Sequence, residues 1–150
     1  MGFLDKLKGA VNAVTGGAAE VTMEFGSNVV ALGETIEVRV TCKSKGSEVK
    51  SKGVFVDIQG EEVITYRDES NKEKSQSKTT FTQEIQIAPA LVLAPNDGKE
   101  FRGQITIPTT LLPSYQGHLA RHTISIRGRL EAFGNDPDSG YKPVTVVAKR

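Results

Sequence analysis

The chain has 150 residues and carries 19 lysines and arginines against 18 aspartates and glutamates, so its formal net charge is only +1. That length fits one domain with one core, and the balanced charge excludes a molecule that is drawn as a whole to nucleic acid. The single cysteine, Cys42, excludes an internal disulfide, and no secretory leader or bilayer-spanning apolar run is visible. We therefore expect a cytoplasmic protein without a nucleic-acid partner.

The first 17 residues differ in pattern from the rest of the chain. Their apolar residues recur at helical spacing, and Gly16-Gly17 then ends the pattern. The apolar stripe consists of Phe3, Leu4, Leu7, Val11 and Val14. This predicts an N-terminal amphipathic helix over 1–17 whose stripe needs a cover. The stripe is a candidate partner-binding surface, for which the domain itself or a second copy in a homo-oligomer ranks before a membrane surface.

From Ala18 onward the apolar period is two, which is the spacing of strands with one buried face. Turn residues separate about eight or nine such runs, and the runs do not alternate with helices. The sequence therefore predicts an all-β fold, a single antiparallel β-sandwich of immunoglobulin-like architecture over 18–150. The residues expected in its core are Val38, Val40, Val56, Ile58, Ile105, Ile107, Ile124 and Ile126.

Two parts of the chain are expected to lie in water. The segment from Arg67 to Lys78 is almost wholly polar, so it has nothing to offset its ordering entropy and is predicted to be a mobile loop. Arg127 alternates with Ile126 and is expected on the solvated face, where its truncation changes the stability little.

No set of residues converges on catalysis. His118 and His122 are four apart, which would suit a metal on a helix, but turn residues and alternation make them a loop histidine and a surface strand histidine. Cys42 shares the apolar face of its strand and is interpreted as a core thiol. The loop 136–140 has the Asp-x-Asp-x-Gly form of a calcium loop but lacks the distal glutamate, and a polar connection is favoured. We expect no cofactor, no metal and no enzyme activity.

A basic stretch is the remaining candidate site. Its five cations are opposed within the stretch by Glu48 alone, and they are Arg39, Lys43, Lys45, Lys50 and Lys52. Such a set favours a phosphate-bearing or acidic partner. Lysines that keep an exposed strand edge from aggregating explain it equally well.

Several motifs carry a family resemblance. The cassette of Ile105-Thr106-Ile107-Pro108, the turn 113–117 and the alternating run 122–131 resembles the arrestin-like domain, as do the runs 31–36, 54–60 and 96–101. The opening, 1–7 and 16–21, is similar to sporulation-control proteins of the Spo-zero-M group, which belong to the same superfamily. The resemblance covers most of the chain and implies an arrestin-like sandwich. Family members usually pair two such sandwiches, whereas this length holds one.

The function implied by the resemblance is that of a non-enzymatic protein–protein adaptor or regulatory scaffold, related to sporulation or stress control. Such a protein presents sheet edges and loops to a protein partner. The alternative is a peripheral membrane protein held by the N-terminal helix and the basic stretch.

Overall fold

The structure is a computed structural model that describes residues 18–132, 134 and 136–149. Every regular element in this part is a strand, which confirms the all-β prediction, and no helix there is long and apolar enough to cross a membrane. The strands are β1 (Ala19–Phe25), β2 (Val29–Ala31), β3 (Thr35–Ser44), β4 (Val49–Arg67), β5 (Glu73–Ala88), β6 (Leu91–Leu93), β7 (Gly98–Thr106), β8 (Tyr115–Gln116), β9 (Ala120–Ala132) and β10 (Lys142–Val147). The amphipathic helix expected over 1–17, with its apolar stripe, lies outside the described residues.

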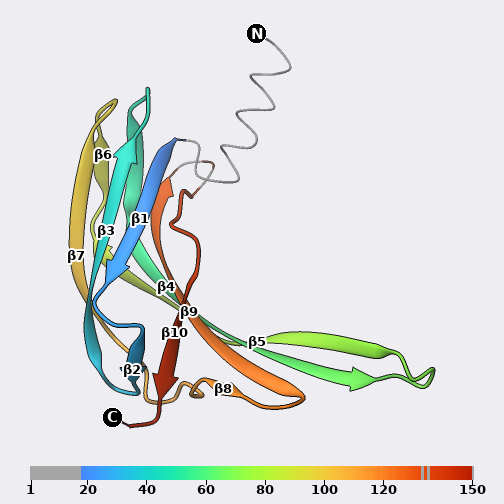
Figure 1. The fold of residues 1–150 in the computed structure, drawn as a ribbon. Helices are drawn as coiled ribbons and strands as arrows, with labels where there is room; N and C mark the ends of the chain where they lie inside the picture. The colour runs from blue at the N-terminus through green and yellow to red at the C-terminus, as the bar shows by residue number, and fades with distance from the viewer. Residues whose placement is uncertain (1–17, 133, 135, 150) are drawn as a thin grey trace, which may run out of the picture.

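Two open sheets pack face to face as a sandwich (Figure 1). One sheet has the order β1-β3-β7, and the other has the order β2-β10-β9-β4-β5, with β6 paired to β4 and β8 to β9. All strand pairs are antiparallel except β2 with β10, so the antiparallel prediction is wrong for this one pair. The reason is the turn at Gly33, which has a φ of 80° and carries the chain from β2 into the other sheet. No hairpin then imposes an antiparallel direction on β2.

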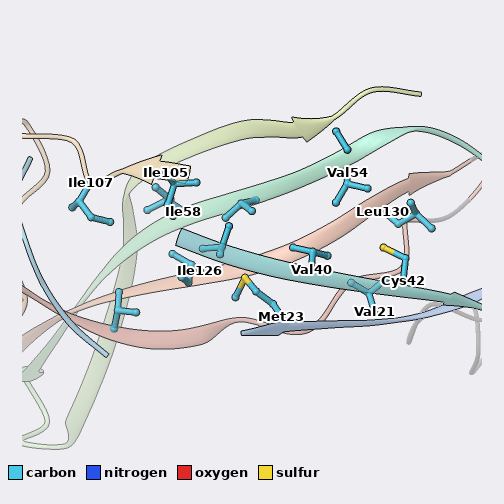
Figure 2. Close-up of a cluster of buried hydrophobic side chains, with 14 of the residues drawn as sticks. Val21, Met23, Val40, Cys42, Val54, Ile58, Ile105, Ile107, Ile126 and Leu130 are labelled. Atoms are coloured by element: carbon cyan, nitrogen blue, oxygen red, sulfur yellow. The ribbon is translucent and has the colours of Figure 1, made fainter. Parts of the chain in front are cut away.

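The core lies between the two sheets and is built from alternate residues of both (Figure 2). Met23 of β1 and Val40 of β3 point from the smaller sheet, and Ile58 of β4 and Ile126 of β9 point from the larger one. All eight predicted core residues are no more than 1% exposed. The predicted alternation of these strands is therefore confirmed.

Beyond the sandwich, β4 and β5 continue as a long hairpin, residues 61–79, which we call the arm (Figure 1). β4 runs without a break over 19 residues into the arm, and residues 73–78 belong to β5. The mobile loop predicted from Arg67 to Lys78 is therefore wrong, because only residues 68–72 form the turn.

The arm is ordered by backbone pairing, and this pairing forms although most of its side chains are polar. β4 pairs with β5 as far as Arg67 and with β9 as far as Ile64. At the turn, the Asp68 carboxylate accepts the N–H groups of Ser70 and Lys72, each at 2.9 Å. Backbone hydrogen bonds between the strands help to offset the ordering entropy of the arm without burial of side chains. The hydropathy of the sequence does not reveal this contribution.

We expect Ile126→Ala to lower the free energy of unfolding by about 2–5 kcal/mol, because the residue is fully buried and its truncation leaves a cavity. Ile64→Ala is the matched control, since Ile64 on the arm is 38% exposed and should lose about 1 kcal/mol or less. Urea denaturation measures both. Equal losses at the two positions would contradict the assignment of core and arm.

Candidate interaction surface

The five basic residues singled out in the sequence do not form one patch. Arg39 and Lys43 lie on the solvated face of the three-stranded sheet, while Lys50 and Lys52 lie on β4 in the other sheet. Lys45 lies in the connection between β3 and β4. The structure thus separates residues that the sequence places close together.

Arg39 has acidic neighbours on both sides. Its Nη2 is 2.5 Å from Oε2 of Glu24 on β1, and its Nη1 is 3.8 Å from Oε1 of Glu100 on β7. Lys43 and Lys45 remain as exposed cations at the end of β3. The Lys45 N–H donates to the Ala18 carbonyl at 3.2 Å, so these lysines lie beside the start of the described chain.

A buried ionic group, which we call the Asp57 cluster, occupies the outer face of the seven-stranded sheet. Asp57 of β4 is 5% exposed and Arg129 of β9 is 6% exposed. Nε and Nη2 of Arg129 donate to the two Asp57 carboxylate oxygens at 2.9 and 3.1 Å, and Arg127 Nε donates to Asp57 at 2.7 Å. Asp136 and Asp138 complete the cluster, at 3.2 Å from Arg129 and 3.6 Å from Arg127. The cluster joins β4, β9 and the loop 136–140.

Alternation assigned these charged side chains to a solvated face, so the sequence reading missed the cluster. The expectation that Arg127 is a weakly coupled surface residue is wrong, because it binds a buried carboxylate. The Arg129 guanidinium lies 4.8 Å from the centre of the Phe55 ring, and its hydrogen bonds to Asp57 raise its pKa. The one signal for the cluster is opposite charge at Asp57 and Arg127, which becomes visible only when these residues are known to be cross-strand partners.

The carboxylates of the loop 136–140 bind N–H groups and arginines of the protein itself. Asp136 accepts the Ala132 N–H at 3.1 Å, Asp138 accepts the Gly140 N–H at 2.7 Å, and both contact the arginines of the Asp57 cluster. Within the described residues, no three His, Cys, Asp or Glu side chains are grouped so that they could hold a metal. These contacts favour the polar connection over a calcium loop.

A buried histidine lies at the base of the arm. His122 is 2% exposed, so the prediction of a surface strand histidine is wrong. Its Nε2 is 2.6 Å from Thr80 Oγ1, its Nδ1 is 3.1 Å from the Pro113 carbonyl, and the Tyr115 ring stacks on it at 5.9 Å. The segment that contains Pro113 and β8 covers it, which alternation within one strand does not reveal. His118 is exposed in a loop, as expected.

Large apolar side chains are exposed on the arm and on the neighbouring segment 115–119, and we call them the arm patch. They are Ile64, Tyr66, Tyr115 and Leu119, with exposed fractions of 38%, 45%, 39% and 59%. Tyr66 and Leu119 line one shallow hollow. The Tyr115 hydroxyl donates to the Glu62 carboxylate, and this hydrogen bond raises the pKa of Tyr115.

The two open sheets and the core between them form the kind of β-sandwich that the arrestin-like resemblance of the sequence implies. The fold is similar to the crystal structure of Spo0M, a sporulation control protein from Bacillus subtilis, with a TM-score of 0.63 and 16% sequence identity. The match covers 86% of this chain and 49% of that chain, so this chain spans about half the length of the solved protein. A comparison with curated proteins gave no match.

Residues 7–140 match the family model Spo0M, described as SpoOM protein. Because this match covers most of the chain, the chain belongs to the SpoOM protein family. The resemblance found in the sequence motifs is thereby confirmed.

We expect Arg129→Met to lower the free energy of unfolding by about 3 kcal/mol at neutral pH, because Asp57 then stays buried with one of its two arginines lost. Arg102→Met is the matched control. Arg102 is 3.0 Å from Glu100, its side chain is 64% exposed, and its loss should cost less than about 1 kcal/mol. Urea denaturation of both variants tests the difference, and similar losses would show that the Asp57 cluster is no stronger than a surface ion pair.

Cys42 is fully buried, as predicted, and burial raises the pKa of its thiol from 9.0 to about 12. The folded state thus favours the neutral thiol, a contribution that is complete below pH 9.0 and is lost as the pH rises towards about 12. Between these pH values the free energy of unfolding should fall less in Cys42→Val than in the wild type. The difference between the two proteins should reach up to about 4 kcal/mol. Reaction of the native wild-type thiol with a disulfide reagent should be slow until urea unfolds the protein. Rapid reaction of the native protein would contradict the burial.

Proposed function

We propose that this chain is a non-enzymatic regulatory adaptor in sporulation control and that it presents the arm patch to a protein partner. Membership in the SpoOM family and the description of the structural relative as a sporulation control protein support the regulatory role. The observation that carries the adaptor mechanism is the arm itself, a paired hairpin that projects from the sandwich (Figure 1). The arm exposes Tyr66, and Tyr115 is exposed on the neighbouring strand β8.

The chemistry of the arm patch suits protein recognition. Tyrosine gives a large contact area with few rotatable bonds and keeps a hydroxyl for hydrogen bonding, which explains its enrichment at interfaces. Backbone pairing with both β5 and β9 fixes Ile64 before a partner arrives. Binding then costs less conformational entropy than binding by a flexible loop would.

The proposal places the adaptor in the cytoplasm, where a protein whose one cysteine is buried needs no oxidising environment. No catalytic step is assigned to it. The carboxylates and arginines of the Asp57 cluster bind one another, and burial keeps the Cys42 thiol neutral at physiological pH.

Affinity capture from the native organism tests the arm patch. The double variant Tyr66→Ser/Leu119→Ser should lose its specific partner by at least about ten-fold, the effect of about 1.4 kcal/mol. The double variant Val92→Ser/Leu112→Ser removes equally exposed apolar side chains elsewhere and should keep the partner. Equal capture by both variants would contradict the assignment of the surface. Unchanged spore counts after deletion of the gene would contradict the sporulation role.

The alternative is a peripheral membrane protein, and the exposed Lys43 and Lys45 beside Ala18 are the observation that favours it. Lysines near an anionic surface contribute about 1 kcal/mol each. Co-sedimentation with phosphatidylserine vesicles separates the two proposals. Sedimentation that Lys43→Glu/Lys45→Glu abolishes, with no effect of the Tyr66→Ser/Leu119→Ser variant, would favour the membrane.

A further inference from the structure

The strand β5 ends the seven-stranded sheet, and along its length it pairs only with β4. Near the sandwich, β5 packs against the other sheet, where the Ile87 side chain lies close to Gly103 of β7. Along the arm, residues 73–79 take no part in the backbone hydrogen bonds that the described residues form outside their strand ladders. Their outward N–H and C=O groups therefore offer a template for one more strand.

We propose that this edge pairs antiparallel with β5 of a second copy, in a register centred on Ser77, so that two arms form one continuous sheet. This inference goes beyond the proposed adaptor function, because it concerns the edge of the arm and leaves the arm patch on its face accessible. A two-fold pair requires a surface that is complementary to itself. The open edge carries one acidic residue, Glu73, and two basic ones, Lys74 and Lys78, so its net charge is low and a second copy is excluded only where two lysines would face each other.

The lysines select the register. Residues that face each other across an antiparallel pair lie on the same side of the sheet, and like charges in such pairs are destabilising. A register centred on Gln76 would place Lys74 opposite the second copy's Lys78, and symmetry would repeat this repulsion. Centring the pair on Ser75 would pair as many residues, but it would bring Lys72 at the end of the turn opposite the second copy's Lys78.

The register centred on Ser77 contains no like-charge pair. It places Gln76 opposite Lys78 and Ser75 opposite Thr79 in the other copy, so that amide, ammonium and hydroxyl groups meet. All of these side chains are exposed in the single chain, and no packed contact must break before pairing. The sequence of the edge is thus compatible with itself in this register.

A bulge ends the stretch that can pair. Thr80 is an extra residue between Phe81, which pairs with Gly60, and Thr79, which pairs with Glu61, and its hydroxyl is bound to His122. The alternation of side chains shifts at this point, so residues beyond it do not continue the register. Two-fold pairing also uses the open edge of both copies. The product is a closed dimer and not a growing fibre.

A cysteine placed on the two-fold axis tests the register. The natural cysteine, Cys42, is buried, so any disulfide between two copies forms through the cysteine introduced on the arm. In Ser77→Cys the two Cα atoms would be about 4.5–5.5 Å apart, within the range of a disulfide. In the control Ser75→Cys they would be about 13 Å apart, which is four residues along a strand. We expect Ser77→Cys to form a covalent dimer in glutathione buffer at least about ten-fold faster than the control. Equal rates, or faster reaction of Ser75→Cys, would overturn the register.

Light scattering and sedimentation test the association without an added thiol. The wild-type chain should shift from 16.2 kDa towards twice that mass as its concentration rises. Ser77→Lys would bring two lysines together on the axis and should weaken dimerisation by at least about ten-fold, with an unchanged unfolding midpoint. A wild-type chain that stays at 16.2 kDa over the whole concentration range, or a Ser77→Lys variant that dimerises as the wild type does, would overturn the proposal.

Discussion

The pairing of β4 with a neighbour on each side is the interaction on which the rest of the structure depends. β5 and β9 flank it both inside the sandwich and in the arm. The first half of β4 sends Val56 and Ile58 into the core, and the second half exposes Ile64 and Tyr66. One continuous ladder carries both halves, so burial in the sandwich helps to offset the ordering entropy of the arm. The arm patch therefore has a defined position although few of its own side chains are packed.

The transition from sandwich to arm is made by small and polar residues. A Cβ at Gly60 would lie 2.7 Å from Thr80 Oγ1 and 3.2 Å from His122 Nε2, so glycine leaves room for both polar side chains. Thr80 is the extra residue of the bulge in β5, and a bulge increases twist and bends its strand. This gives a physical reason why the hairpin leaves the sandwich at an angle (Figure 1). The hydrogen bond between Thr80 and His122 holds the bend from the side of β9.

Local pattern was sufficient for the core and insufficient for the candidate surface. Alternation identified Val56 and Ile126 as buried, because it depends only on neighbours along one strand. The bond between Arg129 and Asp57 joins residues 72 positions apart, and the pairing of β9 with β4 that creates it is not readable from either strand alone. The arm was missed for a related reason. Its order comes from the backbone ladder, while the prediction of a mobile loop weighed only apolar side chains.

Polar residues perform opposite tasks in the sandwich and on the arm, and burial decides which task they perform. In the sandwich, a slip of β9 by one residue would turn Arg129 towards the core and leave Asp57 buried without it, so the Asp57 cluster specifies the register strongly. On the exposed edge of β5, serine, threonine and glutamine bind water equally well in any register. The charged residues of this edge and of the turn beside it are what distinguish one alignment from another there. Because nothing stronger competes on that edge, a like-charge contact that would matter little in the core is enough to exclude an alignment.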